Sequence, residues 1–216
     1  MNMKRVLFYC FFSVLTVVAL GQRKLTEATL HYAINVVAVS DSSQSALFNN
    51  AQYICYLKGV NSRMDLITSL GKQTTLLLGK TGKTLLMKEF GPQRYMTELT
   101  QQQWLQLNRK YDQAKLEIVD DTLRINGFLC RKAMATTTDG NRYIAWFTTE
   151  LIPVYPDFQL LAKTLPGLLI QYETTIGKTP VVYTLQAINF NPVPVALFDV
   201  PTTGYRLLKF EENGEK

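Results

Sequence analysis

The fold of this chain is decided by three short blocks in its second half, INGFLCRKA at 125–133, AWFT at 145–148 and LPGLLI at 165–170. The first two are apolar and strand-like, and Asp139-Gly140 between them is a typical turn. Pro166-Gly167, within the third block, forms a corner ahead of a third strand-like run. We therefore predict two strands joined by a turn, followed by a corner and a third strand.

The predicted strand at 142–149 is apolar on both of its faces. Successive side chains of a strand point to opposite sides, so Trp146 and Phe147 lie on different faces. A strand with two apolar faces has to be covered on both sides. The sequence therefore predicts covering elements on each side of the sheet.

Most of the remaining chain also has the alternating period of strands. The strands predicted ahead of the three blocks cover 28–39, 52–58, 63–69, 73–79, 83–90 and 94–99. The others cover 115–119, 123–137, 142–149, 168–175, 180–189 and, more weakly, 205–210.

Three segments break the strand rhythm, at 41–51, 100–112 and 155–164, and each is a candidate for a short helix or a lid. Regularly spaced strands with few helices favour an antiparallel sheet rolled into a half-barrel or a sandwich. We predict a mainly β (α+β) fold, in which the antiparallel sheet is curved into a half-barrel with one to three short helices as its lid.

The N-terminus predicts export. Lys4 and Arg5 precede an apolar run of 15 residues, Val6 to Leu20, with a small-residue exit at Gly21. This is the pattern of a cleaved signal peptide, and the run is shorter than the roughly 20 residues of a permanent membrane helix. Cys10 lies inside the run, where it cannot carry a lipid anchor after cleavage.

We accordingly predict a signal peptide at 1–21, a single β-rich domain at 22–210 and a polar tail at 211–216. The mature protein is expected to be periplasmic or secreted, with no permanent membrane span. Loss of Lys4 and Arg5 lowers the formal net charge from +6 to +4. The remaining basic residues form no run, so nucleic-acid binding is not predicted.

The run GKTGKT at 79–84 invites comparison with a phosphate-binding loop, but the comparison fails. That motif needs a glycine five residues before Gly82, where this chain has Leu77. The helix that should follow is also missing, because 83–90 has the pattern of a strand. We expect a hairpin turn here and no nucleotide binding.

No catalytic, cofactor-binding or metal-binding residue is predicted, and the protein is not expected to be an enzyme. After processing, His31 is the only histidine, and it lies within a predicted strand. Two carboxylate pairs could be compared with a glycosidase site. The better interpretations are a solvated turn for Asp120-Asp121 and a polar tail for Glu211-Glu212.

Cys55 and Cys130 remain after processing, in a chain expected to reach an oxidising compartment. A disulfide between them is one interpretation, and it requires Cα atoms within about 7 Å of one another. The other is that both are small buried residues on different strands.

Hydrophobic ligand binding also stays open. Aromatic residues make up 11% of the chain, enough to line an apolar concave face, although they could equally fill the core. The two partner hypotheses are a hydrophobic small molecule or lipid held on that face, and an envelope protein bound by a structural or assembly factor with a filled core.

The three blocks resemble the GLPGLI family of exported Bacteroidetes proteins, which have no assigned reaction. Thr164 stands where the family name has its first glycine, so a sister family of uncharacterised exported proteins is the alternative. The resemblance implies a sheet similar to that of periplasmic lipoprotein carriers, a half-barrel with a helical lid, and no catalytic residues. The residues that carry it are Gly127, Cys130, Lys132, Trp146, Phe147, Leu165, Pro166 and Gly167.

Overall fold

The computed structural model describes residues 22–37, 46, 48, 50–177 and 179–210. The predicted signal peptide, the polar tail with Glu211-Glu212 and most of the candidate lid at 41–51 lie outside these residues. Among the residues described, no helix is long and apolar enough to cross a bilayer.

The described elements are mostly strands. They are β1 (Arg23–Leu25), β2 (Glu27–Val36), β3 (Gln52–Lys58), β4 (Asn61–Thr68), β5 (Gly71–Leu78), β6 (Lys83–Phe90), β7 (Gln93–Leu99), β8 (Lys115–Ile125), β9 (Phe128–Thr136), β10 (Arg142–Thr148), β11 (Leu151–Pro153), β12 (Leu168–Ile176), β13 (Thr179–Asn189) and β14 (Arg206–Leu208). The helices are α2 (Gln101–Leu107), α3 (Arg109–Asp112) and the 3-10 turns η1 (Pro156–Phe158), η2 (Leu160–Ala162) and η3 (Val195–Phe198).

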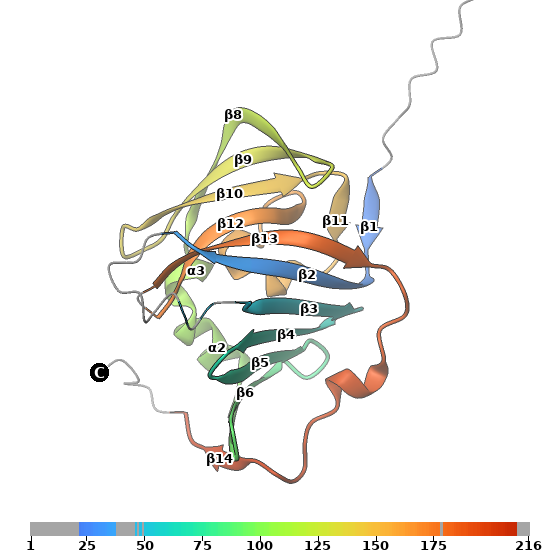
Figure 1. Cartoon of the computed structure of the whole chain (residues 1–216), viewed down its shortest axis with the longest axis vertical. Coiled ribbons are helices and arrows are strands. Elements are labelled where there is room, and N and C mark those ends of the chain that lie inside the picture. Colours follow the sequence, from blue (N-terminus) through green and yellow to red (C-terminus); the bar gives the residue numbers. More distant parts are fainter. Residues whose placement is uncertain (1–21, 38–45, 47, 49, 178, 211–216) are drawn as a thin grey trace, which may run out of the picture.

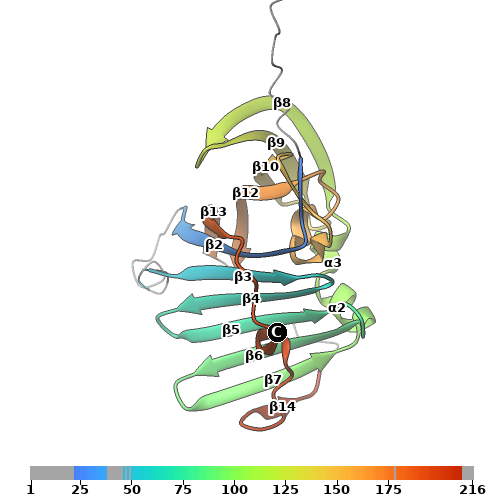
Figure 2. The same ribbon diagram turned by 90° about the vertical axis from the view of Figure 1, so that its right-hand side faces the viewer.

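Twelve of these strands form one curved sheet (Figures 1 and 2), in the order β14-β7-β6-β5-β4-β3-β2-β13-β12-β10-β9-β8. Neighbouring strands are antiparallel except for β14 and β7. The sheet does not close on itself, so β14 and β8 are its edges. The predicted fold class, a curved antiparallel sheet with few helices, is confirmed.

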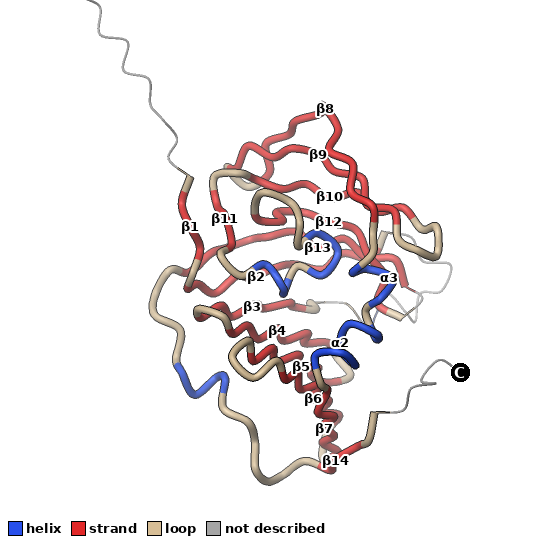
Figure 3. Tube along the Cα trace, turned by 180° about the vertical axis from the view of Figure 1, so that it is seen from behind, coloured by secondary structure: helices blue, strands red, loops and turns tan. Residues whose placement is uncertain are grey.

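The sheet is covered on both faces. The helices α2, α3, η1 and η2 lie in front of it in Figure 3, and we call this side the lid face. Along β5, Leu77 joins the core cluster that includes Phe158 of η1, whereas its neighbour Leu76 packs in a second cluster with Val193 and Phe198. Alternation along the strand thus sends successive leucines into two cores.

The second core is closed by the chain after β13, residues 190–205, which we call the arm. In Figure 2 the arm runs across the sheet from β13 to β14. Lys58 Nζ donates to the Val193 carbonyl oxygen at 2.8 Å, and Arg63 Nη1 donates to that of Leu197 at 2.9 Å. The Val193 N–H donates in turn to Glu27 Oε1 at 2.7 Å. Polar side chains of β2, β3 and β4 therefore fix the arm through its backbone.

The strand predicted at 123–137 is wrong in one respect, because it is two strands. Asn126 and Gly127 have φ values of 48° and 88° and turn the chain between β8 and β9. Left-handed residues of this kind are typical of tight hairpins. Residues 123–125 therefore belong with 115–118 in one strand, β8.

The solvated turn expected at Asp120-Asp121 is also corrected. Both residues are exposed but lie inside β8, where the register against β9 shifts between Ile118 and Thr122. The extra residues form a bulge at the sheet edge. Such irregular, charged stretches protect an edge strand from pairing with another chain.

The other turns follow the prediction. Residues 79–82 of the GKTGKT run connect β5 to β6 as a hairpin, and Gly140, with a φ of 85°, lies in the turn between β9 and β10. Two short elements had no periodic signal, namely the three-residue strands β1 and β11, which pair in parallel apart from the large sheet.

Candidate functional site

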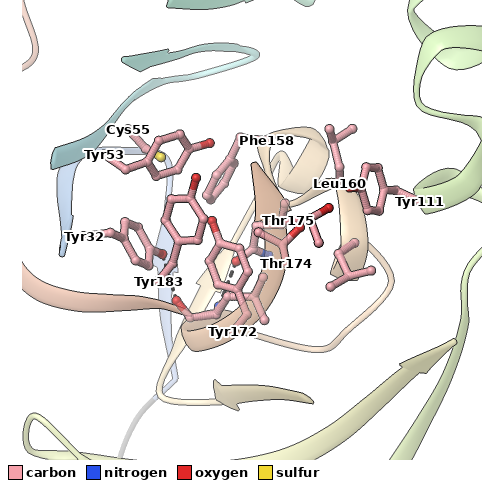
Figure 4. A pocket seen from close by; sticks show the side chains of 13 residues that line it. Tyr32, Tyr53, Cys55, Tyr111, Phe158, Leu160, Tyr172, Thr174, Thr175 and Tyr183 are labelled. Carbon is pink, nitrogen blue, oxygen red and sulfur yellow. Dashed lines mark hydrogen bonds between the residues drawn. The ribbon is translucent and has the colours of Figure 1, made fainter. Parts of the chain in front are cut away.

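A cavity of about 210 Å³ lies between the middle of the sheet and the lid (Figure 4). Four tyrosines on adjacent strands, Tyr172, Tyr183, Tyr32 and Tyr53, form its sheet side, and we call it the tyrosine pocket. Phe158, Gln159, Leu160 and Leu161 of the lid form the opposite side. The lining is completed by Cys55, Tyr111, Leu169, Thr174 and Thr175.

The register of the sheet assembles the four tyrosines. Tyr172 of β12 is directly opposite Tyr183 of β13, and Tyr32 of β2 is directly opposite Tyr53 of β3. The Tyr172 and Tyr183 rings stack with centroids 4.9 Å apart and planes at 3°. Tyr53 meets Tyr183 at 4.9 Å, and Tyr32 lies 6.0 Å from both Tyr53 and Tyr172. The rings therefore form one closed aromatic group.

Gln159 connects the lid to the sheet. Its side chain is buried, donates from Nε2 to the Gly167 carbonyl oxygen at 3.2 Å, and accepts the Leu169 N–H at Oε1 at 2.8 Å. Both partners belong to the Pro-Gly corner and the start of β12. Within the lid, the segment that carries η1 and η2 is tied to α3 by an ion pair between Lys163 and Asp112.

The pocket carries no charged side chain among the described residues that line it. Burial raises the pKa of Tyr32, Tyr53 and Tyr172 well above the usual value, and it also raises that of Tyr183. The tyrosines therefore stay neutral near pH 7. Tyr32 donates its hydroxyl hydrogen to the Leu169 carbonyl oxygen at 2.8 Å.

Cys55 lines this pocket, whereas Cys130 lies on β9, and both are free, buried thiols. The disulfide interpretation is corrected accordingly, because β2, β13, β12 and β10 separate the two strands in the sheet. Burial raises the pKa of the Cys130 thiol to about 11 and that of Cys55 further. Neither thiol is poised as a thiolate nucleophile.

The signature residues support the fold and do not line the pocket. Phe147 is fully buried, and a Cβ at Gly167 would collide with the backbone carbonyl of Thr148. Lys132 and Trp146 are directly paired on β9 and β10, with Lys132 Nζ 5.6 Å from the indole centroid. Lys132 also pairs with Asp121 at 3.3 Å. Gly127 lies in a turn, Cys130 and Leu165 are buried, and Pro166 precedes the close contact at Gly167.

A second hollow of about 400 Å³ lies beside the GKTGKT hairpin and shares Leu160 with the tyrosine pocket. Its charged side chains have both signs, and two of its lysines are already paired, Lys83 with Glu98 and Lys163 with Asp112. His31 lies within β2, as predicted for a strand histidine. The described residues contain no group of three His, Cys, Asp or Glu side chains placed to hold a metal ion.

Sequence reasoning did not identify the tyrosine pocket. Its only signal was a tyrosine within each of four predicted strands, and strand periodicity alone does not say which strands are neighbours. The lid was better anticipated, since 155–164 contains η1 and η2 and 100–112 contains α2 and α3.

Comparison with family models and with curated proteins finds no match for this chain. Similar solved structures include PNGF-II, at 11% identity over 86% of this chain and 32% of that one, with a TM-score of 0.50. An uncharacterized conserved protein from Thermus thermophilus shares 9% identity over 86% and 92% of the two chains, with a TM-score of 0.48. LprF from Mycobacterium bovis shares 12% identity over 78% of this chain and 88% of LprF, with a TM-score of 0.35.

This chain spans about a third of the length of PNGF-II. At these identities the likeness concerns the fold alone. The resemblance of the three sequence blocks to the GLPGLI family stays a prediction.

Proposed function

We propose that this chain is an exported, non-enzymatic binding protein that holds a hydrophobic ligand in the tyrosine pocket, between the sheet and the lid. Export rests on the signal-peptide pattern of the first 21 residues. Membership of the GLPGLI family or a sister family rests on the three sequence blocks, and the mature protein would act in the periplasm or outside the cell.

The observation that carries this proposal is the uncharged cavity itself. Elsewhere, packing between the sheet and the lid buries residues such as Phe147, Leu168 and Ile170 completely, whereas here the four tyrosines line one side of an open cavity. Largely apolar cavities with a few hydroxyl or amide groups are typical of small-molecule sites. Thr174, Thr175 and the tyrosine hydroxyls supply such groups here.

The same lining supports binding without catalysis. General acid–base chemistry near pH 7 uses groups whose pKa lies close to the working pH. The pocket tyrosines and Cys55 have pKa values shifted upward by burial, away from that range. No histidine or carboxylate is among the described residues that line the cavity.

Native mass spectrometry of the mature protein, purified from its export compartment, tests the proposal directly. We expect a co-purified small molecule, and we expect Thr174→Phe to abolish its retention, because the new ring fills the cavity. Thr122→Phe, at an exposed position of β8, is the matched control and should retain the ligand. A ligand-free protein without affinity for any apolar probe would end the proposal.

A second candidate, an assembly factor that binds another envelope protein, is favoured by the exposed apolar residues at one sheet edge. Ile118 and Leu123 of β8 and Leu129 of β9 are all at least 41% exposed. The bulge at Asp120-Asp121 limits pairing to part of β8. Leu123→Asp should release a co-purified protein that Leu207→Asp, near the other edge, retains. Equal retention by both variants would contradict this function.

A further inference from the structure

We infer that the ligand of the tyrosine pocket is an uncharged aromatic compound of one or two rings that carries a hydroxyl or carbonyl oxygen. This inference rests on the proposed function and specifies the ligand class. The inference excludes a whole acyl chain and an ionised head group as ligands of this pocket.

The size of the cavity sets the size of the ligand. An apolar cavity of about 150 Å³ in another protein accommodates benzene, whereas sites for drug-sized ligands begin at about 300 Å³. At about 210 Å³, the tyrosine pocket lies between these values. One ring with a substituent, or two fused rings, fits this space.

The walls favour a flat aromatic ligand. Tyr172 and Tyr183 already stack, and Tyr53 meets Tyr183 edge to face at 72°. Phe158 and Tyr111 add two further rings from the lid (Figure 4). Offset stacking and edge-to-face contacts each increase affinity severalfold beyond the area that is buried. An aliphatic chain gains none of this increment.

The lining also selects against charge. A carboxylate in this cavity would lose its water and find no cationic side chain among the described lining residues. The Tyr172 and Tyr183 hydroxyls make no hydrogen bond to another described side chain. The Tyr32 hydroxyl, in contrast, already donates its hydrogen to the Leu169 carbonyl oxygen. Neutral hydroxyls both donate and accept, so they suit a hydroxyl or carbonyl oxygen on the ligand.

Three probes of similar carbon count test the ligand class by isothermal titration calorimetry of the mature protein at pH 7. They are 2-naphthol, 2-naphthoate and 1-decanol. We expect 2-naphthol to bind at least about tenfold more tightly than 2-naphthoate, because only the latter buries a charge. We also expect 2-naphthol to bind more tightly than 1-decanol.

Tyr172→Phe and Tyr183→Phe keep the rings and remove one hydroxyl each, so either should weaken 2-naphthol binding about fivefold. Tyr95→Phe on β7 is the control and should leave it unchanged, because Tyr95 bonds to Gln93 outside the pocket. Thermal unfolding of each variant shows whether its fold is retained.

Equal or tighter binding of 2-naphthoate would overturn the inference, as would tighter binding of 1-decanol; either result leaves the proposed function in place. Binding of none of the three probes overturns the inference too. If native mass spectrometry then also finds no ligand, the proposed function fails with it.

Discussion

Tyr172 and Tyr183 lie directly opposite one another on β12 and β13, with their rings parallel to within 3° and their centroids 4.9 Å apart. The two residues are partners both in the strand register and in ring stacking. The register of these two strands therefore positions the aromatic group of the pocket. A one-residue slip would send one ring to the opposite face of the sheet.

Alkaline pH should destabilise the protein through this group. Burial raises the pKa of Tyr32, Tyr53, Tyr172 and Tyr183 above the usual 10.0, and that of Cys55 and Cys130 above 9.0. The unfolded chain therefore releases protons that the folded chain retains, and stability present below these values is lost as pH rises. Each such group removes about 1.4 kcal/mol of unfolding free energy per pH unit.

Denaturant titrations between pH 8 and about pH 11 measure this loss. Tyr183→Phe removes one of the groups and should flatten the decline by about 1.4 kcal/mol per pH unit above pH 10. A stability that stays constant up to about pH 11 would contradict the burial of neutral tyrosines.

Gly167→Ala should be strongly destabilising. The added methyl group would overlap the Thr148 carbonyl, a backbone atom that cannot move without distorting β10. We expect a loss of about 3 kcal/mol in unfolding free energy. At Gly127, where nothing lies within 4 Å and φ is 88°, alanine should cost only about 1 kcal/mol. Chemical denaturation of both variants tests the difference, and similar losses would count against the close contact.

Gln159→Ala should loosen the lid. The substitution leaves the Leu169 N–H and the Gly167 carbonyl buried without their side-chain partner, a loss of about 2 kcal/mol. Hydrogen exchange should accelerate at Leu169 and across η1 and η2. Gln106→Ala, at an exposed position of α2, is the control. Unchanged exchange in Gln159→Ala would show that the lid is held by its apolar contacts alone.

Acid should weaken the attachment of the arm. The hydrogen bond from Lys58, together with that from the Val193 N–H, lowers the pKa of Glu27 below 4.5. Its stabilising contribution is therefore present above pH 4.5 and is lost as pH falls through the lower, folded-state value. The Val193 amide chemical shift in NMR spectra should follow this titration.

Glu27→Gln should remove that titration, whereas Glu98→Gln on β7 should preserve it, since Glu98 pairs with Lys83. A Val193 shift that titrates identically in all three proteins would assign the effect to another group.

Local patterns predicted most strands and the lid. Residues 52–58 and 83–90 were predicted with the bounds that the structure has, because alternation and flanking glycines are local signals. The boundary near 123–126 was missed, because Asn126-Gly127 sits between two apolar runs that read as one. β1 and β11 are too short for any period to show.

The amino-acid sequence by itself determined where most of the strands and the lid segments at 100–112 and 155–164 lie, that the strand at 142–149 needs cover on both faces, and that the GKTGKT run is a turn. Only the tertiary structure decided that four tyrosines meet, that Cys55 and Cys130 stay apart and that the arm closes the second core. The physical reason is that alternation depends on neighbours along the chain, whereas strand register and cavity shape arise from contacts between distant segments. Tyr32 meets Tyr172 only because β13 pairs with both β2 and β12.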